Sequence, residues 1–274
     1  MKFTVLGAGG FIGNHLAKAL KDIDGAVIYA PRRQGKSDIF DEVLRQELGN
    51  VFYCIGLTAN FRNQPYDTVE AHVCMLKRLL EHGKFESLTY LSSTRVYEGA
   101  PTTQESAVLH ASPENPGHIY NLSKMMGESL CFASGRNVRI ARLSNVFGIG
   151  MSKNNFIGQI LKSAVDTGHI DFLTTPDSAK DYISIADVTQ WLPKIALSGK
   201  HAIYNIAHGQ NTSNMEIARF LEQKGFSVHF AKDAETWSFP DINTSRLVNE
   251  YGVPQHSLLK EFDSLLNSFA QLNL

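Results

Sequence analysis

The chain has 274 residues, and 43% of them are hydrophobic, which is enough to fill the core of a large α/β domain and argues against disorder. Its 26 Lys and Arg residues nearly balance its 27 Asp and Glu residues, so its charge does not favour nucleic acid or an anionic membrane as a partner. We therefore expect a small-molecule substrate.

The chain begins with the pattern of a strand, a glycine-rich turn and a helix. Residues 3–6 are apolar, glycines follow them, and apolar residues then recur at helical spacing over residues 12–20. GAVIYA (25–30) and NVFYCIG (50–56) follow as two predicted strands, each bounded by Gly or Asn in the manner of a strand buried on both faces.

Helices and strands continue to alternate along the middle of the chain. Residues 68–83 predict one helix that ends at Gly83 as its C-cap, with one apolar face formed by Val69, Val73, Leu76 and Leu80. SLTYLSS (87–93) and VRIARLS (138–144) are predicted strands on either side of a helix that contains YNLSK (120–124). This alternation predicts βαβ units and the α/β fold class with a Rossmann-type, doubly wound parallel sheet.

The second half of the chain departs from this alternation. Residues 147–175 are predicted to leave the sheet, and HAIYNIA (201–207) predicts a late return strand. A capping box at Ser213 and Glu216 begins another helix. A last helix carries a stripe of apolar residues, Leu258, Phe262, Leu265 and Phe269.

No linker separates two domains in the sequence, so we predict that two units are interleaved. Residues 1–148 and 179–206 are predicted to form a dinucleotide-binding domain. Residues 149–178 and 207–274 are predicted to form a small substrate-binding lobe.

Other features of the sequence argue against a membrane anchor, disulfides and metal. The apolar N-terminus is interrupted by glycines, and the other apolar runs are too short to span a bilayer, so we expect a soluble, cytoplasmic protein. Cys54, Cys74 and Cys131 lie far apart in apolar runs, which favours reduced thiols. The ten histidines show no metal-ligand spacing, so we predict no metal site.

The glycine-rich turn predicts a dinucleotide site. Its glycines allow a tight turn, a close approach of the backbone to a pyrophosphate, and a helix N-terminus directed at the phosphates. The predicted cofactor contacts are Gly7, Gly10, Phe11, Ile12 and Gly13 in this turn, and Ile55, Gly56 and Leu57 at the end of the third strand. The alternative is a glycine-rich connection without a ligand.

The end of the second predicted strand favours NADP(H) over NAD(H), although NAD remains possible. An acidic residue at this place would bind the adenosine ribose and repel a 2′-phosphate, but the chain has Ala30 there. Arg32, Arg33 and Lys36 follow, and guanidinium groups suit a phosphate. The alternative interpretation is a solvated basic loop.

Tyr120 and Lys124 are four residues apart, so they lie on one face of a helix. A lysine ammonium near a tyrosine, whose pKa is ordinarily about 10, favours the phenolate and makes a proton-transfer role possible. A partner hydroxyl is available from Ser92, Ser93 or Thr94 at the end of a strand, where open α/β sheets bind ligands. The alternative is a pair on the helix surface without a chemical role.

Five ordered motifs, GAGGFIG, YLSSTRVYEG, YNLSK, ARLSNVFGIG and KDYISIADV, together give the chain a family resemblance. The chain resembles the extended short-chain dehydrogenase/reductases, the NAD(P)-dependent epimerase/dehydratase family that acts mainly on nucleotide sugars, over nearly its whole length. The resemblance implies that Tyr120 is the acid/base, Lys124 its electrostatic and ribose-binding partner, and Ser93 the catalytic hydroxyl. It also implies a homodimer packed through the helices that include YNLSK.

The resemblance also implies substrate contacts from Ser93, Thr94, Asn145 and Lys180, the last at a position where the family often has an arginine that binds the diphosphate. Family dehydratases carry an Asp-Glu pair directly after the catalytic hydroxyl, and here Thr94 and Arg95 stand in its place, which disfavours dehydration.

The predicted reaction is reduction of a 4-keto-deoxysugar joined to a nucleotide, by hydride transfer from NADPH with Tyr120 as the acid/base. The first alternative is a nucleotide-sugar 4-epimerase, which uses the same residues but shows no net consumption of cofactor. A non-catalytic, NADP(H)-sensing regulator on the same fold is a further alternative.

Overall fold

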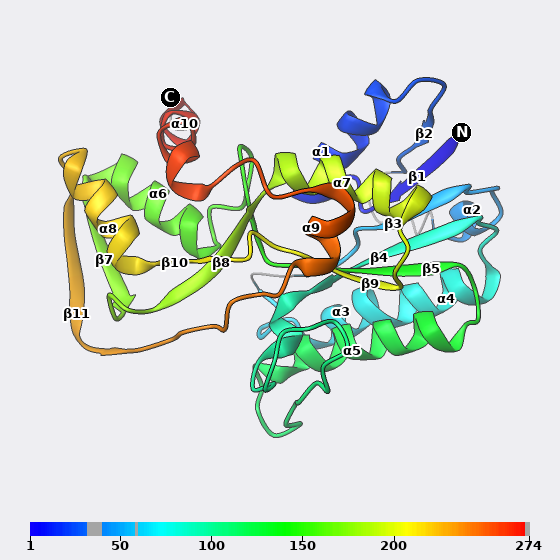
Figure 1. Ribbon diagram of the computed structural model, residues 1–274, viewed down its shortest axis with the longest axis horizontal. Coiled ribbons are helices and arrows are strands. Elements are labelled where there is room, and N and C mark those ends of the chain that lie inside the picture. Colours follow the sequence, from blue (N-terminus) through cyan, green and yellow to red (C-terminus); the bar gives the residue numbers. More distant parts are fainter. Residues whose placement is uncertain (32–39, 58–59, 272–274) are drawn as a thin grey trace.

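The computed structural model describes residues 1–31, 40–57 and 60–271 and is built around one six-stranded parallel sheet (Figure 1). The strands lie in the order β2-β1-β3-β4-β5-β9, so the chain moves outward from β1 to β2 and then returns past β1 to β3. This reversal is the point at which doubly wound sheets bind ligands. The strand bounds are β1 Lys2–Leu6, β2 Val27–Tyr29, β3 Asn50–Tyr53, β4 Ser87–Ser93, β5 Val138–Leu143 and β9 Ile203–Ile206.

Helices cover both faces of this sheet (Figure 1). On one face, α1 (Phe11–Ala19) and α7 (Ile185–Ser198) share a core with apolar residues of the sheet. On the other face, α4 (Met75–His82) and α5 (His118–Ala133) contribute Leu76, Leu79 and Cys131 to a second core. The predicted α/β class with a doubly wound parallel sheet is confirmed.

The prediction that GAVIYA is buried on both faces is wrong. Only β2 within it forms a strand, and β2 lies at the edge of the sheet beside β1. Val27 is 62% exposed there. An apolar run of this length indicates that a strand forms. It does not indicate whether the strand lies at the edge or in the middle of the sheet, because that depends on the order of all the strands.

The helix predicted over residues 68–83 is divided by a π-helical turn. The chain forms α3 (Pro65–Val69), a π turn over Glu70–Cys74, and then α4, which ends before Gly83. The π turn shifts the register, so that Val69 and Val73 are only half-buried, whereas His72 is fully buried. Gly83 has an extended backbone rather than the left-handed one of a typical glycine C-cap, with φ −71° and ψ 144°.

A small lobe lies beyond the carboxyl ends of the large sheet. Strands β6 (Asn145–Phe147), β8 (Ala179–Ser184) and β10 (Asn211–Ser213) form one sheet, and β7 (His169–Thr174) pairs with β11 (Ser227–Glu235). The prediction that residues 147–175 leave the large sheet is confirmed, as is the return strand, which is β9. The domain boundaries given above remain a prediction.

Three helices close the small lobe, namely α6 (Phe156–Thr167), α8 (Asn214–Gln223) and α10 (Leu258–Gln271). The predicted capping box of Ser213 and Glu216 is present at the start of α8. The predicted stripe of α10 is buried in a core that it shares with α6 and β7, through Leu258, Phe262, Leu265 and Phe269. The other described elements are the short helices α2 (Phe40–Leu44) and α9 (Ser245–Tyr251) and two 3-10 turns, over Leu20–Asp22 and Thr94–Tyr97.

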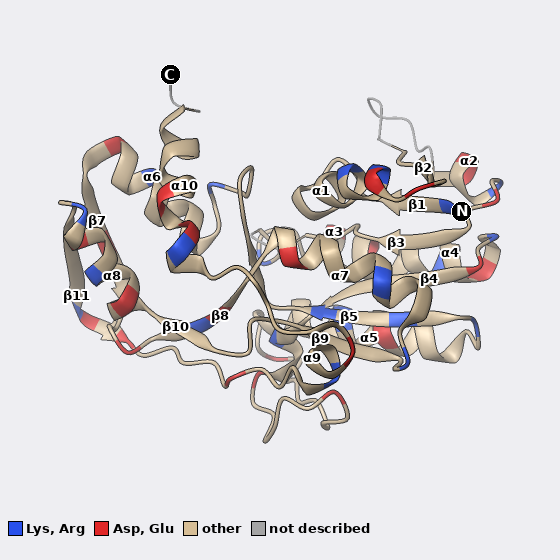
Figure 2. Ribbon diagram, turned by 45° about the horizontal axis from the view of Figure 1, so that its top comes forward, with Lys and Arg blue, Asp and Glu red and all other residues tan. Residues whose placement is uncertain are grey.

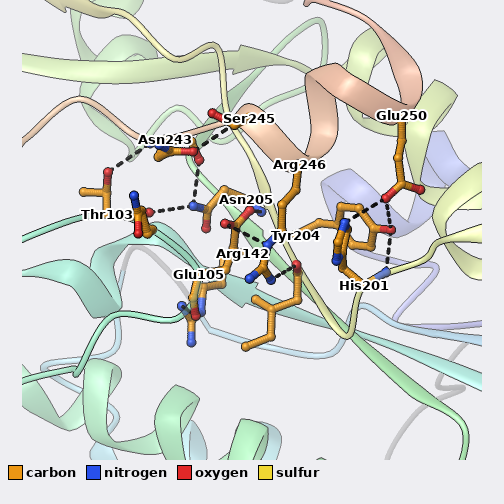
Figure 3. Close-up of polar contacts among 12 residues, drawn as sticks. Thr103, Glu105, Arg142, His201, Tyr204, Asn205, Asn243, Ser245, Arg246 and Glu250 are labelled. Atoms are coloured by element: carbon orange, nitrogen blue, oxygen red, sulfur yellow. Dashed lines mark hydrogen bonds and ion pairs between the residues drawn. The ribbon is translucent and has the colours of Figure 1, made fainter.

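Hydrogen bonds around β9 join the C-terminal part of the chain to the large sheet (Figure 3). The side-chain amide of Asn205 donates to the backbone carbonyls of Thr103 and Asn243, at 2.8 Å each. The Thr103 hydroxyl accepts from the Asn243 backbone N–H at 2.9 Å. Arg246 forms an ion pair with the buried carboxylate of Glu105 at 3.4 Å. Residues 103–105 and 243–246 are therefore fixed to the same strand.

Charged groups of both signs are distributed over both lobes (Figure 2). The three cysteines are free thiols, as the sequence predicts. No helix within the described ranges is long and apolar enough to cross a bilayer.

Candidate active site

A cavity of about 360 Å³ lies at the carboxyl edge of the large sheet, facing the small lobe. Its floor is formed by the glycine-rich turn and the ends of β3, β4 and β5, and one wall comes from the start of α5. The small lobe contributes β6, the start of α6 and Tyr182. Within the described residues, no cluster of three or more His, Cys, Asp or Glu side chains is arranged to hold a metal ion.

The glycine-rich turn has the backbone shape that a phosphate site needs. Gly7 has φ +88°, and a Cβ there would lie 2.7 Å from the carbonyl carbon of Cys54. A Cβ at Gly13 would collide with the carbonyl oxygen of Gly7, which also accepts the Gly10 N–H at 3.0 Å. A side chain at Gly7 or Gly13 would therefore fill the space that brings strand, turn and helix together.

The N-terminus of α1 faces the cavity. Gly10, Phe11, Ile12 and Gly13 all line it, and the first turn carries no acidic residue. The unpaired N–H groups at a helix N-terminus attract an anion, so the turn fits the diphosphate of a dinucleotide.

Other predicted cofactor contacts lie at the end of β3. Ile55 and Gly56 line the cavity, whereas Gly7 and Leu57 are not among its lining residues. Arg32 and Arg33, on which the prediction of NADP(H) depends, lie outside the described residues.

The three predicted catalytic residues meet at one end of this cavity. Ser93 is the last residue of β4, and Tyr120 and Lys124 lie in the first turns of α5. Tyr120 is 7% and Lys124 5% exposed, so they are not a pair on the helix surface. The Ser93 hydroxyl lies close enough to the Tyr120 phenol to lower its pKa, and the Lys124 ammonium donates to the carbonyl of Leu91 at 2.8 Å.

Burial shifts the protonation of both residues toward their neutral forms. Burial raises the pKa of Tyr120, against the smaller effects of the Ser93 hydrogen bond and the positive charge of Arg95. Burial lowers the pKa of Lys124 to about 7, against the charge of the Glu128 carboxylate. At neutral pH, Tyr120 is therefore a neutral phenol that can donate a proton.

The sequence gives no signal for His72, which lies in the π turn and packs against the predicted catalytic residue Tyr120. Its Nε2 accepts the Leu57 backbone N–H at 3.3 Å, and its Nδ1 lies 2.8 Å from the hydroxyl of Ser123. Ser123 in turn donates to the carbonyl of Tyr120, so Nδ1 carries the proton of a neutral imidazole. His72 thereby connects the loop after β3 to the helix that carries Tyr120 and Lys124.

We expect His72 to make the stability of the protein pH-dependent. Burial and the charge of Lys124 lower the pKa of His72 to about 2, so protonation favours the unfolded chain, where a histidine has a pKa of about 6.5. The contribution is complete above pH 6.5 and is lost as the pH falls. Between pH 7 and pH 5, the wild type should lose about 2 kcal/mol of unfolding free energy more than His72→Phe.

Urea unfolding of both proteins at several pH values measures this difference. The comparison at pH 8 serves as an internal control, because the imidazole is neutral there in both the folded and the unfolded chain. Parallel pH dependences of the two proteins would contradict the prediction.

Only some of the predicted substrate contacts line the cavity. Asn145 lines the cavity and donates to the carbonyl of Asp181 at 2.8 Å. Thr94 is buried and is not among the lining residues. Lys180 is not among them either, but its ammonium lies 4.6 Å from the centroid of the ring of Phe156, which does line the cavity. Burial, with the positive charge of Arg95, lowers the pKa of Lys180 to about 8.

Phe61 and Arg95 also line the cavity, although no motif in the sequence marks either of them as a substrate contact. The Phe61 ring lies 5.2 Å from the ring of Tyr120, and the Arg95 guanidinium lies 5.3 Å from the Phe61 ring. Arg95 also reaches Trp237 from the C-terminal part of the chain, at 5.8 Å. A residue this distant in sequence can be found only from the folded chain.

Comparisons with known proteins agree with this geometry. A family model described as the NAD dependent epimerase/dehydratase family matches residues 3–207. A protein of Bacillus subtilis (strain 168), described as the uncharacterized UDP-glucose epimerase YtcB, is 22% identical, with 100% of this chain and 98% of the relative covered.

Two solved structures share the fold over nearly their full length. A variant of UDP-glucuronic acid 4-epimerase from Bacillus cereus, in complex with a UDP-sugar analogue and NAD, is 20% identical with a TM-score of 0.81, covering 99% of this chain and 100% of the other. RMD from Pseudomonas aeruginosa, complexed with NADPH, is 20% identical with a TM-score of 0.79, covering 98% and 99%.

Proposed function

Because the chain belongs to the NAD-dependent epimerase/dehydratase family, we propose that it is a reductase of nucleotide-linked sugars. The substrate is a 4-keto-deoxysugar joined to a nucleotide, and the hydride donor is NADPH. The observation that carries this proposal is the buried, neutral phenol of Tyr120 beside Ser93. Reduction of a ketone needs a proton donor at the carbonyl oxygen, and a phenol with a raised pKa holds its proton at neutral pH.

We assign each residue of the cavity a role in the reaction. The dinucleotide, when bound, would supply the hydride to the carbonyl carbon. Tyr120 donates its phenolic proton to the carbonyl oxygen, and Ser93 holds that oxygen against the phenol through its hydroxyl. The resulting phenolate takes a proton back from solvent, so the net change is conversion of the ketone to an alcohol at the expense of one hydride and one proton.

The proposed cofactor site consists of the glycine-rich turn, the start of α1 and Lys124. The helix N-terminus would hold the diphosphate, and Lys124, whose ammonium lies near Gly56, would hold the nicotinamide ribose, as the family resemblance implies. The preference for NADP(H) is supported by Arg32 and Arg33 in the sequence and by the NADPH found in a structural relative.

A second candidate is a nucleotide-sugar 4-epimerase. The curated relative carries an epimerase name, and a 4-epimerase is among the structural relatives. An epimerase would use the same Tyr120 and Ser93, first to oxidise the sugar and then to reduce it from the other face. Dehydration is disfavoured, because Thr94 and Arg95 supply no carboxyl group beside Ser93.

We also propose a homodimer that packs through α5 and its neighbouring helix. Met126 and Phe132 on α5 are 53% and 47% exposed, and such an interface would cover their apolar surface.

The net consumption of cofactor tests the proposed reaction. Purified protein is incubated either with NADPH and a UDP- or dTDP-linked 4-keto-deoxysugar, or with NAD+ or NADP+ and the corresponding 4-hydroxy sugar, and cofactor absorbance and products are followed. A reductase oxidises one NADPH for each keto sugar that it converts. Conversion of the 4-hydroxy sugar to its epimer without a net change in cofactor would establish the second candidate and contradict the first.

A further inference from the structure

Two guanidinium groups and the reacting phenol surround one aromatic ring at the substrate end of the cavity. The Cζ atoms of Arg62 and Arg95 lie 4.7 Å and 5.3 Å from the centroid of the Phe61 ring. The ring of Tyr120 lies 5.2 Å from the same centroid. Terminal nitrogens of both arginines also approach Gly117, since a Cβ built there would lie 3.5 Å from Arg62 and 3.7 Å from Arg95.

Arg95 is held beside the catalytic hydroxyl by its own backbone. It follows the end of β4, and its N–H donates to the hydroxyl of Ser93 at 3.2 Å. Its side chain lines the cavity, and its positive charge acts on the phenol of Tyr120. A group bound by Arg95 would therefore lie on the sugar whose carbonyl reacts with Tyr120.

The positive charge of this cluster is poorly compensated. The carboxylate of Glu98 lies 3.6 Å from Arg95, but it also accepts a hydrogen bond from Asn121, and the buried Nε of Arg95 forms no hydrogen bond. In the part of the chain that the structure describes, no carboxylate lies within 4 Å of the cationic group of Arg62 or Lys180. Burial lowers the pKa of Arg95, and the positive charge of Arg62 lowers it further, against the opposing effect of the Glu98 carboxylate.

Arg95 and Lys180 lie near one another, because both lie over the Trp237 ring, at 5.8 Å and 4.4 Å from its centroid. Arg95 differs from Lys180 in that it lines the cavity and lies beside Ser93, whereas Lys180 contacts the lining residue Phe156. Arg62 is outside the lining and lies against the Phe61 ring, and the start of α1, where we propose that the cofactor diphosphate binds, is a different part of the lining. A planar guanidinium matches a carboxylate with two parallel hydrogen bonds, and it keeps its charge when partly buried.

We propose that Arg95, assisted by Arg62, binds a carboxylate on the sugar of the substrate. The sugar is then a nucleotide-linked keto sugar that carries an acidic substituent, rather than a neutral one. This inference rests on the proposed function, because it requires a nucleotide sugar to occupy the cavity. The same cations could instead contact the nucleotide diphosphate, and the experiment below separates the two sources of negative charge.

The test measures binding to the protein saturated with NADPH, by titration calorimetry. The ligands are UDP alone, UDP-glucose and UDP-glucuronic acid, together with the corresponding dTDP series, so that sugars differing by one carboxylate are compared on each nucleotide. The wild type should bind the glucuronic acid of its preferred nucleotide about 10- to 100-fold more tightly than the glucose. Arg95→Met should abolish that difference and leave the affinities for the nucleoside diphosphate and the glucose form unchanged.

Three further variants test whether the difference in affinity depends on the guanidinium of Arg95, on Arg62, or on any exposed arginine. Arg95→Lys keeps the positive charge but loses the planar guanidinium that forms two parallel hydrogen bonds. It should retain part of the difference in affinity between the glucuronic acid and the glucose forms. Arg62→Met changes an exposed residue and should reduce the difference without affecting folding. Arg219→Met, an exposed arginine on α8 in the small lobe, is the matched control and should behave as the wild type.

The two ways of failing are distinguishable. If the wild type binds both sugars equally, or if Arg95→Met weakens the nucleoside diphosphate and both sugars alike, the carboxylate site is refuted while the nucleotide-sugar function stands. If none of the nucleotides or nucleotide sugars binds, the proposed function fails and the carboxylate site fails with it.

Discussion

Replacing Tyr120 with Phe should lower kcat by about 10³-fold and leave the affinity for NADPH nearly unchanged. The substitution removes only the phenolic oxygen, so the ring keeps its packing against Phe61 and His72. The variant loses the proposed proton donor beside the Ser93 hydroxyl. Single-turnover oxidation of NADPH with the keto sugar, together with a cofactor titration, measures the two effects separately.

The control for this variant is Tyr66→Phe, which makes the same chemical change on a side chain that is 89% exposed. It should keep the kcat of the wild type. If Tyr120→Phe retained more than a tenth of that kcat, Tyr120 would not be the proton donor, and another group at the cavity would have to take its place.

Replacing Arg142 with Met should lower the free energy of unfolding by about 3 to 5 kcal/mol. Arg142 is 3% exposed and forms a two-pronged ion pair with Glu128, at 2.6 Å and 3.0 Å. It also donates to the hydroxyl of Tyr97 at 2.7 Å. Removal of the guanidinium leaves the buried carboxylate of Glu128 without its cation, next to Lys124 and the end of β4.

The double variant Glu128→Met, Arg142→Met is the informative control, because it removes both buried charges together. It should recover most of the loss and remain about 1 to 2 kcal/mol below the wild type, since the Ser92 hydroxyl loses its acceptor. Denaturant unfolding followed by circular dichroism measures all three proteins. A single variant as stable as the wild type, or a double variant less stable than the single one, would contradict this account.

The parts of the fold that the sequence predicted well are those with a local cause. A strand, three spaced glycines and an amphipathic helix are adjacent in the chain, and the collision of a Cβ at Gly13 with Gly7 shows why glycine is needed there. The spacing of Tyr120 and Lys124 is likewise a property of one helix. Such features depend on backbone geometry within a few residues.

The parts that the sequence did not predict depend on packing between distant segments. The π turn that buries His72 adds one residue to a helical turn, which changes no pattern in the sequence but rotates every later side chain. The half-exposed strand β2 contains the same residue types as a buried one. The approach of Arg95 to Trp237 joins residues from opposite halves of the chain, and only the assembled fold brings them together.

The hydrogen bonds of Asn205 also bear on the order in which the protein becomes complete during synthesis. One side-chain amide donates to carbonyls supplied by residues 103 and 243, so the connection between the loop after β4 and the C-terminal part of the chain cannot form until the ribosome has delivered residue 243. The edge of β5 stays open until the earlier point at which β9 has emerged to pair with it. A nascent chain therefore acquires its glycine-rich turn early but aligns the segment that follows Ser93 among its last events, and chaperone binding to stalled chains should persist to that length.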